Sequence, residues 1–189
     1  MAISLAKGEN TTIDPGLTNI TVGLGWNPSE TPGVEFDLDA SCFLLNAQNK
    51  VRSDADFIFY NQPTTKNGSV KYGGDSRTGA GNGDDETIQI ELPKVDADVQ
   101  SIIFTVTIYK GKERKQNFGM VRNAYIRLVN NVDGQEIMRF ELTEDAGENT
   151  ALIFAKLYRR DGQWKFGAIG QGYDSDLGVI AGKLGVNIK

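Results

Sequence analysis

Short segments that alternate apolar and polar residues recur along the chain, with turn-forming dipeptides between several of them. The segments are rich in β-branched and aromatic residues, which favour strands, and strand side chains alternate between two faces. The dipeptides Asn67-Gly68, Asp133-Gly134 and Asp161-Gly162 supply the positive φ angles of tight hairpin turns. We therefore expect strands at residues 19–26, 36–45, 54–61, 86–92, 101–109, 124–130, 136–142 and 151–159.

Helical signals are scarce, and the clearest is YDSDLGVIAGKLGV near the C-terminus, with Ser175 as a predicted N-cap and Gly185 as a stop. Segment 111–121 predicts one or two helical turns. Many strands with hairpin turns and no strand–helix alternation predict an all-β fold, an antiparallel β-sandwich with a short C-terminal helix and minor helical turns. Because no linker or internal repeat is visible, residues 1–189 are expected to form one domain. The apolar residues that share one face of the C-terminal helix are Leu177, Ile180, Ala181 and Leu184.

Composition narrows the chemistry that the chain can carry. It has no histidine and one cysteine, Cys42, which excludes histidine-assisted catalysis, internal disulfides and cysteine-rich metal sites. The net charge of −5 argues against direct binding of nucleic acid but permits binding of cations. No apolar run approaches the roughly 18–20 residues of a membrane span, and residues 1–10 lack the profile of a signal peptide. We expect a cytoplasmic protein without membrane insertion.

Acidic residues occupy alternating positions in two of the predicted strands. In FDLDASCFLL, Asp37 and Asp39 fall on the face opposite the apolar residues, about 7 Å apart at a rise of ~3.4 Å per residue. Like charges in this arrangement repel each other, so the face is either simply solvated or neutralised by a bound cation. Asp54 and Asp56 repeat the pattern, although Asp54 also suits a turn.

The loop GDSRTGAGNGDDE, residues 74–86, has four glycines, four acids and no bulky apolar side chain. Glycines let backbone carbonyls turn inward, and carboxylate, amide and carbonyl oxygens are the ligands of the hard cations calcium, magnesium and manganese. Arg77 and Ala80 stand where an EF-hand loop needs an acid or amide and a glycine, which excludes an EF-hand. We predict one or two calcium ions shared by this loop and the neighbouring strand. The predicted metal-binding residues are Asp37, Asp39, Asp75, Gly81, Asn82, Gly83, Asp84, Asp85 and Glu86.

The chain resembles the TerD family of tellurite-resistance and stress proteins from residue 1 to about residue 188. The motifs that carry the resemblance occur in the order GLGW, FDLDASCFLL, DADFIFYNQ, GDSRTGAGNGDDE, FTVTIY, AYIRLVN, ELTEDA and LYRRDGQWKFGAIGQGY. The resemblance implies a calcium-binding β-sandwich in a bacterial cytoplasm, with other proteins of a stress-response system as partners. It adds Asp56 and Asp145 as further metal-binding candidates, while Ala80 falls where relatives often carry an acid.

The leading hypothesis is a non-enzymatic calcium-binding protein that acts as a sensor or interaction module. A first alternative is a metal-dependent hydrolase or phosphoesterase that uses the aspartate cluster. A second is a module that binds a small anion or a nucleotide at YKGKERK, residues 109–115, where four basic residues accompany the single acid Glu113. Such a basic run can also be an ordinary solvated loop. Direct tellurite chemistry is disfavoured because Cys42 lies on the core-facing side of its predicted strand.

Overall fold

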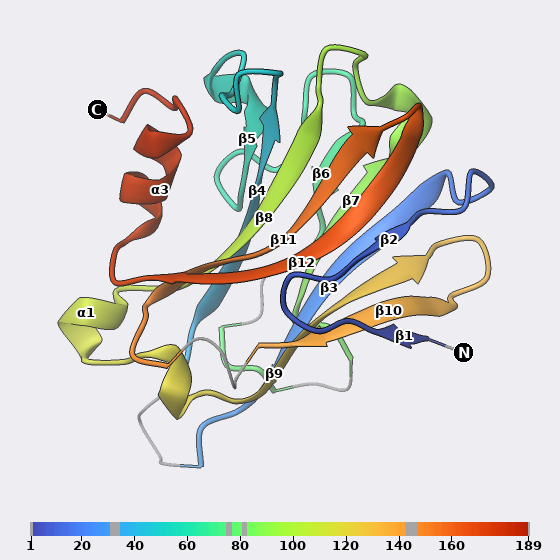
Figure 1. The fold of residues 1–189 in the computed structure, drawn as a ribbon. Coiled ribbons are helices and arrows are strands. Elements are labelled where there is room, and N and C mark those ends of the chain that lie inside the picture. The colour runs from blue at the N-terminus through green and yellow to red at the C-terminus, as the bar shows by residue number, and fades with distance from the viewer. Residues whose placement is uncertain (1, 31–34, 75–76, 81–82, 143–146, 189) are drawn as a thin grey trace.

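The computed structural model describes residues 2–30, 35–74, 77–80, 83–142 and 147–188. Its strands form two six-stranded sheets that pack face to face (Figure 1). Sheet A has the strand order β1-β10-β9-β3-β7-β6, and sheet B has the order β2-β12-β11-β8-β4-β5. The strands of sheet A are β1 (Ile3–Ser4), β10 (Glu136–Glu141), β9 (Arg122–Asn130), β3 (Asn19–Asn27), β7 (Glu86–Glu91) and β6 (Val70–Tyr72). Those of sheet B are β2 (Asn10–Thr12), β12 (Gln163–Tyr173), β11 (Ala151–Arg160), β8 (Ser101–Ile108), β4 (Leu38–Leu45) and β5 (Phe57–Ile58).

The predicted antiparallel sandwich is confirmed, since every pairing between the described strands is antiparallel except that of β1 with β10. Two of the predicted turns join adjacent strands. Gly134, with φ of 73°, lies in the β9–β10 turn, and Asp161 and Gly162, with φ of 53° and 74°, form the β11–β12 turn. Paired positive φ angles suit the right-handed twist of a hairpin.

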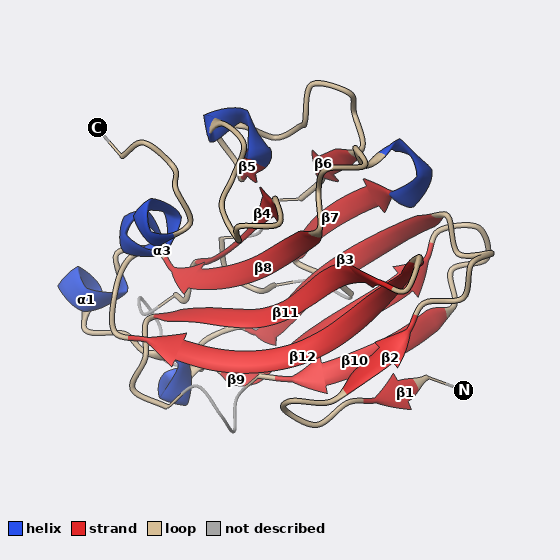
Figure 2. Ribbon diagram, turned by 45° about the horizontal axis from the view of Figure 1, so that its top comes forward, coloured by secondary structure: helices blue, strands red, loops and turns tan. Residues whose placement is uncertain are grey.

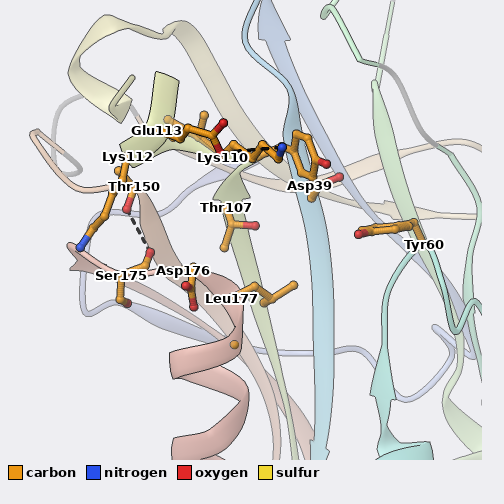
Figure 3. Close-up of a pocket in the computed structure, with 14 residues that line it drawn as sticks. Asp39, Tyr60, Thr107, Lys110, Lys112, Glu113, Thr150, Ser175, Asp176 and Leu177 are labelled. Carbon is orange, nitrogen blue, oxygen red and sulfur yellow. Dashed lines mark hydrogen bonds and ion pairs between the residues drawn. The ribbon is translucent and has the colours of Figure 1, made fainter. Parts of the chain in front are cut away.

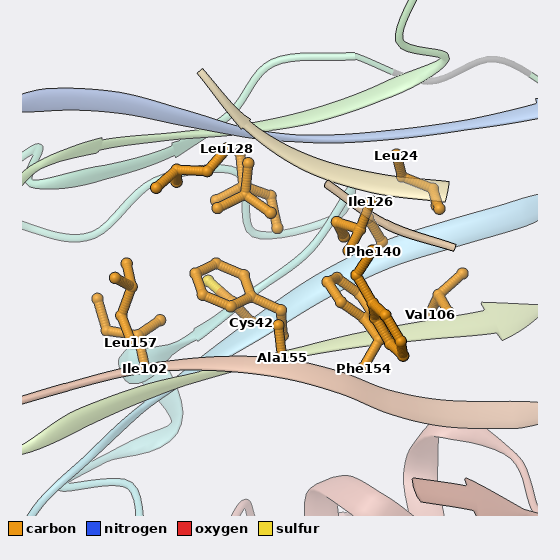
Figure 4. Packing of buried hydrophobic residues seen from close by; sticks show 14 of the residues in the cluster. Leu24, Cys42, Ile102, Val106, Ile126, Leu128, Phe140, Phe154, Ala155 and Leu157 are labelled. Carbon is orange, nitrogen blue, oxygen red and sulfur yellow. The ribbon is translucent and has the colours of Figure 1, made fainter. Parts of the chain in front are cut away.

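The main core fills the space between the two sheets (Figure 4). Leu24 and Ile126 of sheet A face Cys42 and Phe154 of sheet B, and all four are at most 1% exposed. The alternation within β4 is as predicted, because Leu38, Ala40, Cys42 and Leu44 all belong to this core. Burial raises the pKa of the Cys42 thiol far above its ordinary value.

A second apolar cluster lies on the outer face of sheet B, beneath α3 (Leu177–Lys183) (Figure 2). Ile180 and Ala181 of α3 are buried against Phe43 and Leu45 of β4. The predicted apolar face of this helix is confirmed, but Ser175 is not its N-cap. Asp176 is the residue whose carboxylate accepts the Val179 N–H bond at 3.0 Å.

The predicted strand 54–61 is wrong in its first half. Residues Asp54–Asp56 form a 3-10 turn, and only Phe57–Ile58 make β5. The turn is held by Arg52, which donates its backbone N–H and its guanidinium to the Asp56 carboxylate. The short strands β1, β2 and β6 were not predicted. The remaining helical elements of the described residues are η2 (Leu92–Lys94), α1 (Gly111–Arg114) and η3 (Phe118–Met120), the last two inside the predicted segment 111–121.

None of the described helices has the length and apolar character needed to cross a membrane.

Candidate functional site

The acid-rich loop leads into β7, whose first residue is Glu86. At this end of the sandwich the start of β7 lies beside the start of β4 from the opposite sheet and the end of β3 from the same sheet. Three consecutive acids, Asp84, Asp85 and Glu86, enter the fold here. Their side chains occupy three different environments.

Glu86 points into the interior between the sheets and is 0% exposed. Its Oε2 accepts a hydrogen bond from the Ala40 N–H of β4 at 3.2 Å and another from the Tyr72 hydroxyl of β6. Because Ala40 follows Asp39 directly, the buried carboxylate connects the end of the acidic loop to the acidic end of β4. A buried carboxylate is costly unless hydrogen bonds and compensating charge surround it.

Asp85 is half-buried beside the end of β3. Its Oδ2 accepts the Trp26 N–H bond at 3.1 Å, and its own N–H donates to the Leu24 carbonyl at 2.8 Å. The Trp26 indole lies against the loop at Gly79, where an added Cβ would come within 2.5 Å of Nε1. Gly79 has φ of +68°, so both the space and the backbone angle require glycine. The buried Trp26 Nε1–H has no hydrogen-bond partner among the described residues.

Asp84 turns the other way, onto the outer face of sheet A. Its Oδ1 accepts hydrogen bonds from Arg127 Nε at 2.7 Å and from the Tyr125 hydroxyl at 3.2 Å, both from β9. The Tyr125 hydroxyl also lies 3.1 Å from the Gly83 carbonyl. A Cβ at Gly23 would lie 2.2 Å from Asp84 Oδ2, so the carboxylate rests in the space left by a missing side chain.

Asp84 is part of a wider ion-pair network on sheet A. Arg127 also pairs with Glu136 at 3.1 Å, and Glu136 pairs with Arg139, whose guanidinium lies 4.0 Å from the Tyr125 ring centroid. The hydrogen bonds from Arg139 and Arg127 lower the pKa of Glu136. Burial, followed by the negative charge of Asp84, raises the pKa of Tyr125. The hydrogen bond to Asp84 raises the pKa of Arg127, so this guanidinium stays charged.

Asp37 and Asp39 are both half-buried. The Asp37 carbonyl accepts the Tyr109 N–H bond at 2.8 Å, which aligns the start of β4 with the end of β8. Asp39 stands opposite Thr107 in the β4–β8 register and lines a cavity on the outer face of sheet B. The structure therefore brings the Ala40 backbone of β4 to Glu86, while the Asp39 side chain lines the cavity on the outer face of sheet B.

Of the other predicted metal-binding residues, Gly83 and Asp56 lie in the described part of the chain. Gly83 is exposed and has a φ angle of +123°. Both carboxylate oxygens of Asp56 accept hydrogen bonds from Arg52, and this ion pair accounts for the burial of Asp56. The residues that lie outside the described part of the chain are Asp75, Gly81, Asn82 and Asp145. Within the described ranges, no three acidic, histidine or cysteine side chains form a group that could hold a metal ion.

The chemistry of the described donors suits a hard cation, because Asp85, Glu86, Asp37 and Asp39 offer only oxygen atoms. Calcium usually takes six to eight such oxygens. The described carboxylates alone do not make such a group, so a complete shell would need oxygens from residues 75, 81 and 82 as well. The described residues therefore match a calcium site in the type of their donor atoms and in their positions along the chain.

The sequence did not indicate that Tyr72, Tyr125 and Arg127 contact the acidic residues of this region. Each is a single polar residue in a strand pattern, which gives no indication of a partner distant in the sequence. One usable signal existed in GLGW, where Gly23 and Gly25 lie on the same face of β3. Glycines on one face of a strand indicate a close approach, and Asp84 and Tyr125 now occupy that space.

A family model described as "TerD domain" matches residues 1–184. Tellurium resistance protein TerD of Serratia marcescens is 50% identical over 190 residues, covering 99% of each chain. General stress protein 16U of Bacillus subtilis (strain 168) is 47% identical over 192 residues, covering 100% of each. The fold resembles the crystal structure of a homologue of telluride resistance protein (TerD) from Streptomyces coelicolor A3(2), with a TM-score of 0.71 and 24% identity over 88% of this chain and 96% of that one. The chain therefore belongs to the TerD family, which includes tellurium-resistance and general stress proteins.

Proposed function

We propose that this protein binds calcium at the end of the sandwich where the acid-rich loop meets β4. It would act as a non-enzymatic sensor or interaction module in the cytoplasm. The observation that carries the proposal is the position of Glu86, which is fully buried and joins the loop to Ala40 of the opposite sheet. A calcium ion bound by the loop would place positive charge beside this carboxylate and offset the cost of its burial.

The residues that would hold the ion are Asp85 and Glu86 from the described part of the loop, Asp37 and Asp39 from β4, and Asp75, Gly81 and Asn82. Bound calcium would supply a hard, positively charged centre and order the loop. The chain itself supplies the rigid frame, because the Asp85–Trp26 and Glu86–Ala40 hydrogen bonds hold the loop end against both sheets. An ordered loop at the surface is a defined contact site for a second protein.

The names of relatives support a role in resistance or stress, including General stress protein 16U of Bacillus subtilis and Tellurium resistance protein TerD of Serratia marcescens. Proteins of the same stress-response system are the proposed partners. We propose binding rather than catalysis because two of the described acids outside the proposed ligand set are occupied in ion pairs. Asp84 pairs with Arg127, and Asp56 pairs with Arg52.

Isothermal titration of metal-free protein with calcium tests this proposal. Wild type is expected to bind calcium in the micromolar to millimolar range. Asp85→Asn and Glu86→Gln should each weaken binding at least tenfold, because each removes a charged ligand while keeping the side-chain shape. Asp161→Asn is the matched control, since it removes one negative charge in the exposed turn between β11 and β12. No heat of calcium binding in wild type would refute the proposal, and equal affinities in all three variants would move the site elsewhere.

A further inference from the structure

A cavity of about 400 Å³ opens on the outer face of sheet B, between α1 and the start of α3 (Figure 3). Its floor is formed by Asp39 of β4 and Thr107 of β8, which are direct neighbours in the sheet register. Two tyrosines and two lysines form much of its rim. This volume lies within the range that accommodates small organic ligands.

Aromatic rings border the cavity on two sides. Tyr60 and Tyr109 are each 44% exposed, which is unusually open for side chains of this size. Tyr60 is held at the end of a row of rings, because its centroid lies 5.3 Å from that of Phe59, which stacks at 4.4 Å on Phe57. A ring fixed by its neighbours is a ready surface for stacking or edge contacts with a flat ligand.

The positive charges at the rim are only loosely engaged. Lys110 Nζ lies 3.7 Å from the Glu113 carboxylate, and Lys112 Nζ lies 3.3 Å from that of Asp174. The two acids are 72% and 73% exposed, and exposed pairs of this kind contribute at most about 1 kcal/mol. Exchanging such a partner for an anionic ligand therefore costs little. Ser175 also lines the cavity, and its buried hydroxyl has no hydrogen-bond partner among the described residues.

The lining carries one net negative charge, since Asp39, Glu113 and Asp176 outnumber Lys110 and Lys112. Asp176 is engaged in capping α3 through the Val179 N–H group. A bare anion would gain little in such a cavity, whereas an anion attached to a ring would also gain contact with the tyrosines.

From these observations we propose that the cavity binds a small aromatic phosphate. The phosphate group lies at Lys110 and Lys112, and the ring lies against Tyr60 and Tyr109. This site is separate in chemistry from the proposed calcium site and does not require the metal, although Asp39 borders both. It gives the basic segment 109–115 a role beyond that of a solvated loop.

Phenyl phosphate is the probe, titrated into protein kept free of calcium with a chelator and followed by amide chemical shifts. Wild type should bind it more tightly than inorganic phosphate, and phenol should bind weakest. Lys110→Gln and Lys112→Gln should each weaken binding roughly fivefold, the effect of one unit charge about 4 Å away in a watery setting. Asp39→Asn should tighten binding, because it removes the charge that opposes the phosphate.

Lys66→Gln is the matched control, because it removes the same charge from an exposed lysine that does not line this cavity. Thermal unfolding checks that each variant is folded, which we expect because Lys110 and Lys112 are more than half exposed. Absence of phenyl phosphate binding would overturn the proposal. So would equal effects of the three lysine variants, or equal affinities for phenyl phosphate and inorganic phosphate. Calcium titration is measured separately, so failure here leaves the proposed calcium site standing.

Discussion

At the scale of single residues, strand alternation decides what each of three consecutive acids does. Glu86 is the first residue of β7 and falls on its inward face with Ile88 and Ile90, so it is buried. Asp84 instead crosses β3 at Gly23, where no side chain blocks its contact with Arg127. The role of Asp84 as a metal ligand stays a prediction, and in the structure its Oδ1 accepts a hydrogen bond from Arg127 Nε and anchors the end of the loop to the outer face of sheet A.

We therefore expect Asp84 and Arg127 to be energetically coupled. Asp84→Asn and Arg127→Gln should each lower the free energy of unfolding by about 2 kcal/mol, because each leaves a half-buried charged partner without its counter-charge. The double variant should be far less destabilised than the sum of the two, as measured by urea unfolding. Asp84→Asn should reduce calcium affinity less than Asp85→Asn does. If the losses of stability in the two single variants simply added up in the double variant, Asp84 and Arg127 would not be coupled.

At the scale of elements, the strongly periodic strands could be predicted from the sequence, because alternating burial leaves a clear pattern. Residues 101–109 and 151–159 correspond closely to β8 and β11. The prediction for segment 54–61 was partly wrong because its aromatic residues are typical of a strand. In the structure, the Arg52–Asp56 ion pair holds the first half of the segment in a 3-10 turn. Strands β1, β2 and β6 have only two or three residues each, too few for a period to appear.

The N-cap of the C-terminal helix α3 can be tested by mutation. Asp176→Ala should lower the free energy of unfolding by about 1 kcal/mol, because it removes the side chain that accepts the Val179 N–H bond. Ser175→Ala is the comparison, since that hydroxyl makes no hydrogen bond with the described residues and its loss should cost much less. Urea unfolding of both variants checks this. A larger loss for Ser175→Ala would restore the cap predicted from sequence.

At the scale of the whole molecule, the candidate site depends on contacts that no local pattern encodes. Acid-rich composition predicts a cation-binding loop, which stays a prediction, whereas alternation placed Asp39 away from the core, as the structure has it. The pairing of Glu86 with Ala40, 46 positions apart, arises only when the two sheets are packed. The same is true of the cavity, whose lining combines residues near 39, 60, 110 and 176.

Bound at the proposed site, calcium would link the two sheets as well as the ends of the loop. An ion held by residues of β4 and β7 can bind only when sheets A and B are packed together, so it should stabilise the folded chain. At a free calcium concentration one hundred times the measured Kd, the free energy of unfolding should rise by about 2.7 kcal/mol. Because its affinity is expected to be at least tenfold lower, Glu86→Gln should lose about half of this gain or more at the same concentration, while Asp161→Asn should keep it. Thermal and urea unfolding with and without calcium measure the difference. A wild-type protein that binds calcium yet gains no stability would bind it in the unfolded chain equally well, and the proposed link between the sheets would then be wrong.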